Sequence, residues 1–128
     1  MDREKLLDLY KKYELEKTDV YKHQHYVIIT RQGIEKIAAK ENIAINYEVV
    51  KCEPNFAVVK AYAKKEEVQI ETFGSALKGA NYKDGNCNSW YVMEMAEKRA
   101  LSRSVLKLTG FYELGVFGED ESDDFKRK

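Results

Sequence analysis

The segment from Tyr91 to Gly110, YVMEMAEKRALSRSVLKLTG, predicts one long helix and constrains the fold more than any other stretch. It is rich in strong helix formers and contains no glycine or proline before its last residue. At ~3.6 residues per turn it would make about five turns. Ser89 would cap its start, and Gly110 would end it in the position after the C-cap. A helix of this kind needs a sheet or another helix to bury its apolar side, on which Leu101, Val105 and Leu108 cluster.

Three cationic side chains, Arg99, Arg103 and Lys107, recur every four residues along this helix. They therefore form one row on its surface, which we call the basic ridge. Ala96 and Ala100 lie beside the ridge, and such small neighbours would let a bulky partner come close. A solvated helix face with charge pairs four residues apart explains the same spacing about equally well.

Before this helix the apolar period changes to two, which predicts three consecutive strands. These strands span residues 43–49, 56–63 and 67–73, and the loop that follows spans residues 74–88. In the second strand, alanine and valine at alternate positions from Ala57 to Ala63 make a smooth inner face, while Lys60 and Tyr62 point the other way. Short connections between successive strands indicate an antiparallel meander.

Two short helices are expected near the N-terminus. One covers residues 2–13, and the second, residues 31–41, begins after Thr30 as its N-cap. The sequence therefore predicts an α+β fold, in which a three-stranded antiparallel β-meander is packed by a long C-terminal helix. Residues 1–117 would form this single domain, and residues 118–128 would be an acidic, disordered tail.

Composition excludes a uniformly basic nucleic-acid binder, because Lys+Arg and Asp+Glu both number 22 in 128 residues. The charge is uneven, however. The segment 118–124 holds five acids and no base, so the remainder carries a positive excess. Two cysteines, no signal peptide and no long apolar run indicate a cytoplasmic protein without a membrane segment, with Cys52 as a small buried hydrophobe.

Motifs for catalysis are weak. The chain has no phosphate-binding glycine loop, zinc-protease motif or nucleophile elbow. His23 and His25 lack further ligands at metal-site spacing, and Glu94 and Glu97 are explained by charge placement near a helix start. We therefore expect no enzyme activity, cofactor or metal, and a metal-dependent nuclease is the least favoured hypothesis.

Single-stranded nucleic acid is bound by basic grooves that follow the phosphates and by aromatic side chains on which bases stack. The second strand, the loop and the long helix each supply such groups to the rim between sheet and helix. The candidate residues are Lys60, Tyr62, Lys64, Lys78, Tyr82, Lys83, Arg99, Arg103 and Lys107. Taken alone, Tyr62 is better explained as a packing residue, and each lysine as a solubility residue; the binding hypothesis rests on their coincidence at this rim.

The element order and the helix sequence AEKRALSRSVLKLTG resemble single-strand annealing proteins of the Rad-fifty-two type and their phage relatives of the Sak and Erf kinds. Segments ITRQGIEKI and TFGSA also look like small early-region proteins of crAss-like tailed phages, and the resemblance covers roughly Thr30 to Gly118. It implies a non-enzymatic protein that binds single-stranded DNA between sheet and helix, anneals strands and forms a homo-oligomer. Arg99, Arg103 and Lys107 match the basic helix positions, and Lys60 and Lys64 match strand positions more loosely.

The tail GEDESDDF is similar to the partner-docking tails of proteins that bind single-stranded DNA. Its docking residues would be Glu119, Asp120, Glu121, Asp123, Asp124 and Phe125. The alternative function, of another class, is a protein-interaction adaptor in a phage replication or recombination complex, which docks partners through its sheet edge and this tail. A merely solvating tail is about as well supported.

Overall fold

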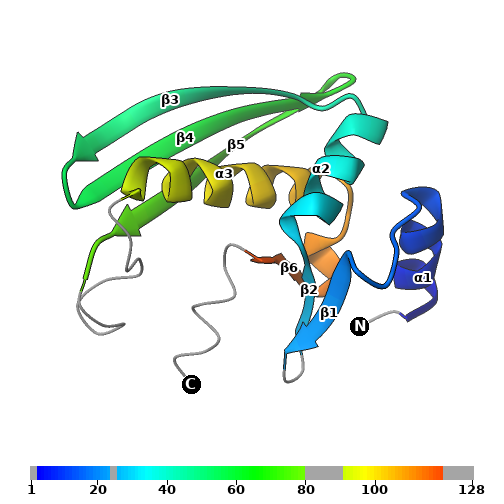
Figure 1. Ribbon diagram of the computed structural model, residues 1–128. Coiled ribbons are helices and arrows are strands. Elements are labelled where there is room, and N and C mark those ends of the chain that lie inside the picture. Colours follow the sequence, from blue (N-terminus) through cyan, green and yellow to red (C-terminus); the bar gives the residue numbers. More distant parts are fainter. Residues whose placement is uncertain (1–2, 24–25, 80–90, 120–128) are drawn as a thin grey trace.

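The computed structural model describes residues 3–23, 26–79 and 91–119, which form two three-stranded sheets that both contact one long helix (Figure 1). The helices are α1 (Arg3–Lys12), α2 (Arg31–Lys40), α3 (Val92–Leu108) and the short 3-10 helix η1 (Tyr112–Leu114). The strands are β1 (Val20–His23), β2 (Tyr26–Ile29), β3 (Ala44–Glu53), β4 (Phe56–Lys65), β5 (Val68–Leu77) and β6 (Val116–Gly118). The predicted α+β class is confirmed. Within the described ranges, no helix combines the length and apolar character needed to span a bilayer.

The larger sheet is the predicted antiparallel meander, with strand order β3-β4-β5. Residues of β4 alternate between buried and partly exposed along most of the strand, as the sequence period indicated. Ala57, Val59, Ala61 and Ala63 are buried on the side that faces α3, which we call the inner face. The opposite side is called the outer face. The inner face is smooth, so α3 lies across β4 and β5 at short range.

Helix α3 approaches the sheet closely at Gly74 in β5. A Cβ atom added there would lie 2.0 Å from the carbonyl oxygen of Ala96 and 2.6 Å from the backbone nitrogen of Ala100. The predicted loop of residues 74–88 is therefore wrong over its first four residues, because β5 continues to Leu77. Glycine indicated a turn in the sequence, whereas in the fold it clears space for the helix backbone. Residues 80–90 of that loop lie outside the described residues.

Gly74→Ala is expected to destabilise the protein by roughly 3 kcal/mol, because the new methyl group meets helix backbone that no side-chain rotamer can relieve. Urea unfolding followed by circular dichroism measures the change in the free energy of unfolding. Gln69→Ala, at an exposed outward-facing position of the same strand, is the control and should stay within about 0.5 kcal/mol. Equal stabilities of the two variants would contradict the close approach of α3.

The smaller sheet joins distant parts of the chain, with strand order β1-β2-β6. β6 pairs with β2 in parallel, so the apolar segment after α3 packs back on the domain as a strand. The first two residues of the predicted tail belong to the folded part: Gly118 ends β6, and Glu119 accepts a hydrogen bond from the backbone N–H of Arg31 at 3.1 Å. Residues 120–128 lie outside the described residues.

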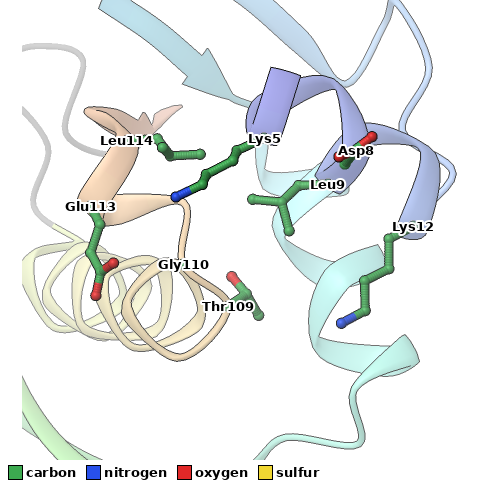
Figure 2. Close-up of a pocket in the computed structure, with 8 residues that line it drawn as sticks. All are labelled: Lys5, Asp8, Leu9, Lys12, Thr109, Gly110, Glu113 and Leu114. Atoms are coloured by element: carbon green, nitrogen blue, oxygen red, sulfur yellow. The ribbon is translucent and has the colours of Figure 1, made fainter. Parts of the chain in front are cut away.

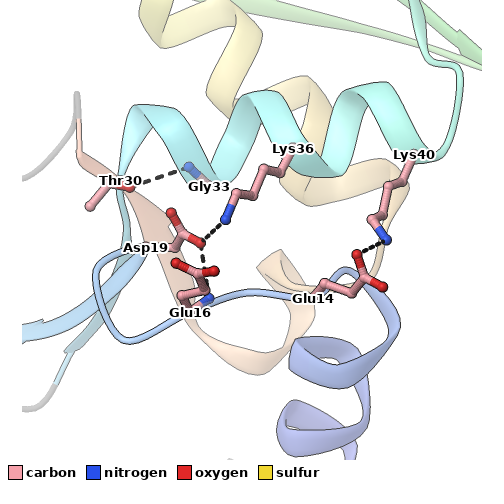
Figure 3. A network of polar contacts seen from close by, with 7 residues as sticks. All are labelled: Glu14, Glu16, Asp19, Thr30, Gly33, Lys36 and Lys40. Carbon is pink, nitrogen blue, oxygen red and sulfur yellow. Dashed lines mark hydrogen bonds and ion pairs between the residues drawn. The ribbon is translucent and has the colours of Figure 1, made fainter.

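A network of charged groups fastens the N-terminal segment to α2 (Figure 3). Asp19 is fully buried; one carboxylate oxygen accepts hydrogen bonds from Lys36 Nζ at 2.7 Å and from the backbone N–H of Glu16 at 2.9 Å. Thr30 Oγ1 caps α2 by accepting from the N–H of Gly33, as predicted. The start of α2 is thus held in place, and β3 follows shortly after its end.

Three carboxyl groups of this region, Glu14, Asp19 and Glu41, titrate below their usual range, and two of them are largely buried. Burial alone would raise the pKa of Asp19, but the hydrogen bonds from Glu16 and Lys36 outweigh it and lower that pKa. For Glu41, the hydrogen bond from Tyr13 Oη at 2.5 Å is the main cause, and Lys12 and Lys65 add to it. Together they lower the pKa of Glu41 to about 2.

Acid should therefore destabilise the fold. A carboxyl whose pKa is lower in the folded state stabilises it above the unfolded pKa, and this stabilisation is lost as pH falls through the folded value. For Glu41 the window runs from about pH 4.5 down to about 2, with roughly 3 kcal/mol at stake. Urea unfolding between pH 7 and 2 measures this slope. Glu41→Gln should be less stable at pH 7 and lose less on acidification; an unchanged pH profile would contradict the assignment.

Candidate nucleic-acid interface

Helix α3 positions the basic ridge, and it begins and ends close to the predicted residues. It runs from Val92 to Leu108, Tyr91 at the N-cap makes no side-chain capping bond, and Gly110 has a positive φ of 88°. The predicted cap Ser89 lies outside the described residues. The buried stripe of α3 that faces the sheet is made of small residues, including Ala96, Ala100 and Ser104. Of the predicted apolar stripe Val105 is fully buried, while Leu101 and Leu108 are half-buried.

The basic ridge does not line an open trough. Arg99 is only 4% exposed, and its Nη1 donates a hydrogen bond to the carbonyl oxygen of Ser75 at 2.7 Å. Arg103 Nη1 donates to the carbonyl oxygen of Phe73 at 2.6 Å. Lys107 is exposed, with Nζ 5.4 Å from the centroid of the Tyr112 ring. Two of the three cations therefore contact strand β5, where their charge is used within the fold.

Both arginines bind the free edge of β5. The backbone N–H of Lys78 bonds to Asn55 O at 2.7 Å, so even-numbered positions of β5 direct their backbone groups toward β4. Backbone groups alternate sides along a strand, so the carbonyls of Phe73 and Ser75 face the open edge. Ala96 and Ala100 bring α3 close enough for guanidinium groups to reach them. The arginines thus occupy acceptors that another strand would otherwise use.

Arg99→Ala is expected to lower the free energy of unfolding by about 2 kcal/mol, because it removes a buried, charge-assisted hydrogen bond to the backbone of β5. Lys107→Ala, on the same helix, removes an exposed cation and should cost no more than about 0.5 kcal/mol. Thermal and urea unfolding of the two variants provide the measurement. If the variants were equally stable, the bond from Arg99 to β5 would not stabilise the fold.

The outer face brings three predicted residues together. Lys60, Tyr62 and Lys64 alternate along β4 on this side, opposite Phe73, Glu71 and Gln69 of β5. Lys60 Nζ lies 4.9 Å from the ring centroid of Tyr62 and 5.6 Å from that of Phe73. The lysine ammonium thus lies between two aromatic rings on neighbouring strands.

Sequence reasoning missed other members of this face. Phe73 is 48% exposed, and Phe56 lies on the same side of β4, with Lys51 Nζ 5.8 Å from its ring centroid. Strand parity was the available signal, because Phe73 is two residues from outward-facing Glu71. Because the predicted strand ended at Phe73, this residue was not recognised as part of the outer face. We name the set Lys51, Phe56, Lys60, Tyr62, Lys64 and Phe73 the outer-face patch.

The charges of this patch are balanced by glutamates. Lys60 pairs with Glu71 at 3.4 Å, and Tyr62 Oη donates to Glu48 Oε1 at 2.7 Å. The hydrogen bond with Tyr62 first, and then Glu71, raises the pKa of Lys60, which therefore stays charged at neutral pH. The bond to Glu48 is the main cause that raises the pKa of Tyr62. The patch combines aromatic rings with cations in exposed pairs, which are weak and exchangeable.

The other candidate residues are placed apart from this patch or lie outside the described ranges. Lys78 follows the last residue of β5 and still pairs with the neighbouring chain segment, through its backbone N–H and Asn55 O. Tyr82 and Lys83 lie outside the described residues, as do Asp120, Glu121, Asp123, Asp124 and Phe125 of the predicted docking tail. Glu119 bonds at the start of α2. Cys52 is exposed on β3, so its predicted burial is wrong.

A cavity of about 370 Å³ opens where α1, the end of α3 and η1 meet (Figure 2). Its lining is Lys5, Asp8, Leu9, Lys12, Thr109, Gly110, Glu113 and Leu114. The two lysines and two acids are all exposed, so the cavity favours neither sign of charge. Among the described residues, no group of three metal-binding side chains is present either.

Comparisons with known proteins assign no family. No protein-family model, curated protein or solved structure matches this chain. The resemblance to single-strand annealing proteins therefore rests on the quoted motifs alone, and the function is argued from the geometry of the outer-face patch.

Proposed function

We propose that this protein binds single-stranded DNA, without catalysing a reaction, on the outer face of its β3-β4-β5 sheet, and promotes strand annealing. The observation that carries the proposal is the cluster of Phe73, Lys60 and Tyr62, in which an ammonium group lies between an exposed ring on β5 and a partly exposed ring on β4. None of the described helices lies on this face, since α3 packs on the inner one. An extended DNA single strand can thus reach the outer face of the sheet.

Stacking would supply most of the affinity. Every base has an aromatic face, and stacking on a side chain contributes about 1–3 kcal/mol per base without sequence preference. Phosphates would replace Glu71 as the partner of Lys60, because this ion pair is solvent-accessible and weak. The balanced charge of the patch implies few phosphate contacts and hence moderate affinity.

Phe73→Ala should weaken binding of a fluorescent single-stranded oligonucleotide about tenfold, because it removes one stacking surface. Fluorescence anisotropy titration measures the dissociation constant. Tyr21→Ala, which removes a comparably exposed ring from β1 in the other sheet, should leave it unchanged. Equal affinities of the two variants would contradict the outer-face site.

Lys60→Glu should weaken binding to all sequences alike, whereas Lys11→Glu on α1 should not. The logarithm of the affinity should fall with the logarithm of salt concentration with a slope of about −0.7 per neutralised phosphate, and Lys60→Glu should make it shallower by one such unit. Annealing is read separately, as faster pairing of complementary labelled strands when protein is added. Tight binding that ignored salt would count against phosphate contacts.

The protein-interaction adaptor remains the second candidate, since the free edge of β3 is unpaired within the described parts of the chain. It predicts that no oligonucleotide binds, and that a replication or recombination protein co-purifies. The anisotropy titration above separates these two functions.

A further inference from the structure

The two edges of the larger sheet differ in their chemistry. On β5, Arg99 and Arg103 occupy the outward carbonyls of Ser75 and Phe73. On β3, ten residues long, no described element of residues 3–23, 26–79 or 91–119 pairs with the outer edge. Such an edge is a ready template for another strand.

The outward backbone groups of β3 follow from the register. Even-numbered β5 positions bond to β4, so the odd-numbered positions of β4 face β5 and its even-numbered positions face β3. The partners of those even positions are Ala44, Asn46 and Glu48. Ile45, Tyr47 and Val49 therefore direct their N–H and C=O groups to the open edge.

The same three residues carry side chains on the inner face, where α3 makes few contacts with β3; Ile45 packs partly buried against the main core, and the other two are exposed. Tyr47 is 39% exposed and Val49 is 56% exposed, although the alternation of the strand places them on the buried side. Apolar side chains and unpaired backbone groups thus occur at the same positions.

We propose that β3 pairs with β3 of a second copy of this chain, antiparallel about a twofold axis, to form a continuous six-stranded sheet. Self-pairing restricts the register. Pairing centred on Glu48 sets two carboxylates opposite each other, and pairing centred farther along crosses the bulge between Val49 and Lys51. Pairing centred on Tyr47 lies in the regular part of the strand.

In the Tyr47-centred register, Ile45 lies opposite Val49 of the second copy. Tyr47 lies opposite Tyr47 of the second copy. Six side chains then fill the inner face between the two α3 helices. On the outer face Asn46 lies opposite Glu48, an amide opposite a carboxylate, so no like charges meet. This pairing does not use the outer-face patch, so it does not depend on the proposed function.

The test is the solution mass of the full chain, by sedimentation equilibrium with light scattering. Wild type should approach twice its 14.9 kDa mass as concentration rises. Val49→Lys places a charge at the pairing edge and should shift the protein to monomer, with unchanged circular dichroism. Val68→Lys, at an equally exposed valine on the opposite edge strand, should leave the dimer intact.

A second measurement fixes the register without relying on disruption. With Cys52→Ser and Cys87→Ser as background, Tyr47→Cys should form a disulfide-linked dimer under mild oxidation, while Val68→Cys should not. A protein of 14.9 kDa at all concentrations would overturn the proposal. So would an oligomer that Val68→Lys dissociates and Val49→Lys does not, or crosslinking at residue 68 but not at residue 47.

Discussion

The close packing of α3 on the inner face of β4 and β5 is the contact on which the rest of the structure depends. It requires small side chains on both partners: alanines at 96 and 100 of the helix, Gly74 in β5, and the alanines of β4. At this distance Thr72 Oγ1 reaches the carbonyl oxygen of Ala100 at 2.9 Å and Ser104 Oγ at 2.6 Å, so buried polar groups are satisfied across the contact. A larger residue at any of these positions would separate helix and sheet and break those bonds.

The same contact decides what the helix cations do. Because the α3 backbone lies against the sheet, Arg99 and Arg103 extend past the margin of β5 and bind its carbonyls. Their charge is thereby used within the fold. Lys60 and Lys51, which lie near the rings of Phe73 and Phe56, come from the strands and lie on the outer face. The proposed nucleic-acid interface is therefore separated from α3 by the thickness of the sheet.

Sequence periodicity predicted the meander, the long helix and the parity of β4, because each depends on local spacing. The features that the sequence did not predict depend on contacts between residues far apart in the chain. A four-residue repeat places Arg99, Arg103 and Lys107 on one row, but only the position of β5 determines which of them meets backbone. The series Ile70, Thr72, Gly74, Ala76 repeats the small inner residues of β4, and this signal could have extended β5 through the glycine. The pairing of β6 with β2 joins residues almost ninety positions apart, which no local pattern encodes.

Closing one edge of a sheet and leaving the other open has a consequence for assembly. A sheet with two open edges can extend into a chain of copies, whereas a sheet with one open edge stops after a single twofold pairing. In the proposed pairing, the arginines on β5 would limit association to a pair, and the bulge in β3 would keep the pairing to the part of the strand before it. The outer face of such a pair would present two patches on one continuous surface, and a strand bound across both would gain affinity from their proximity.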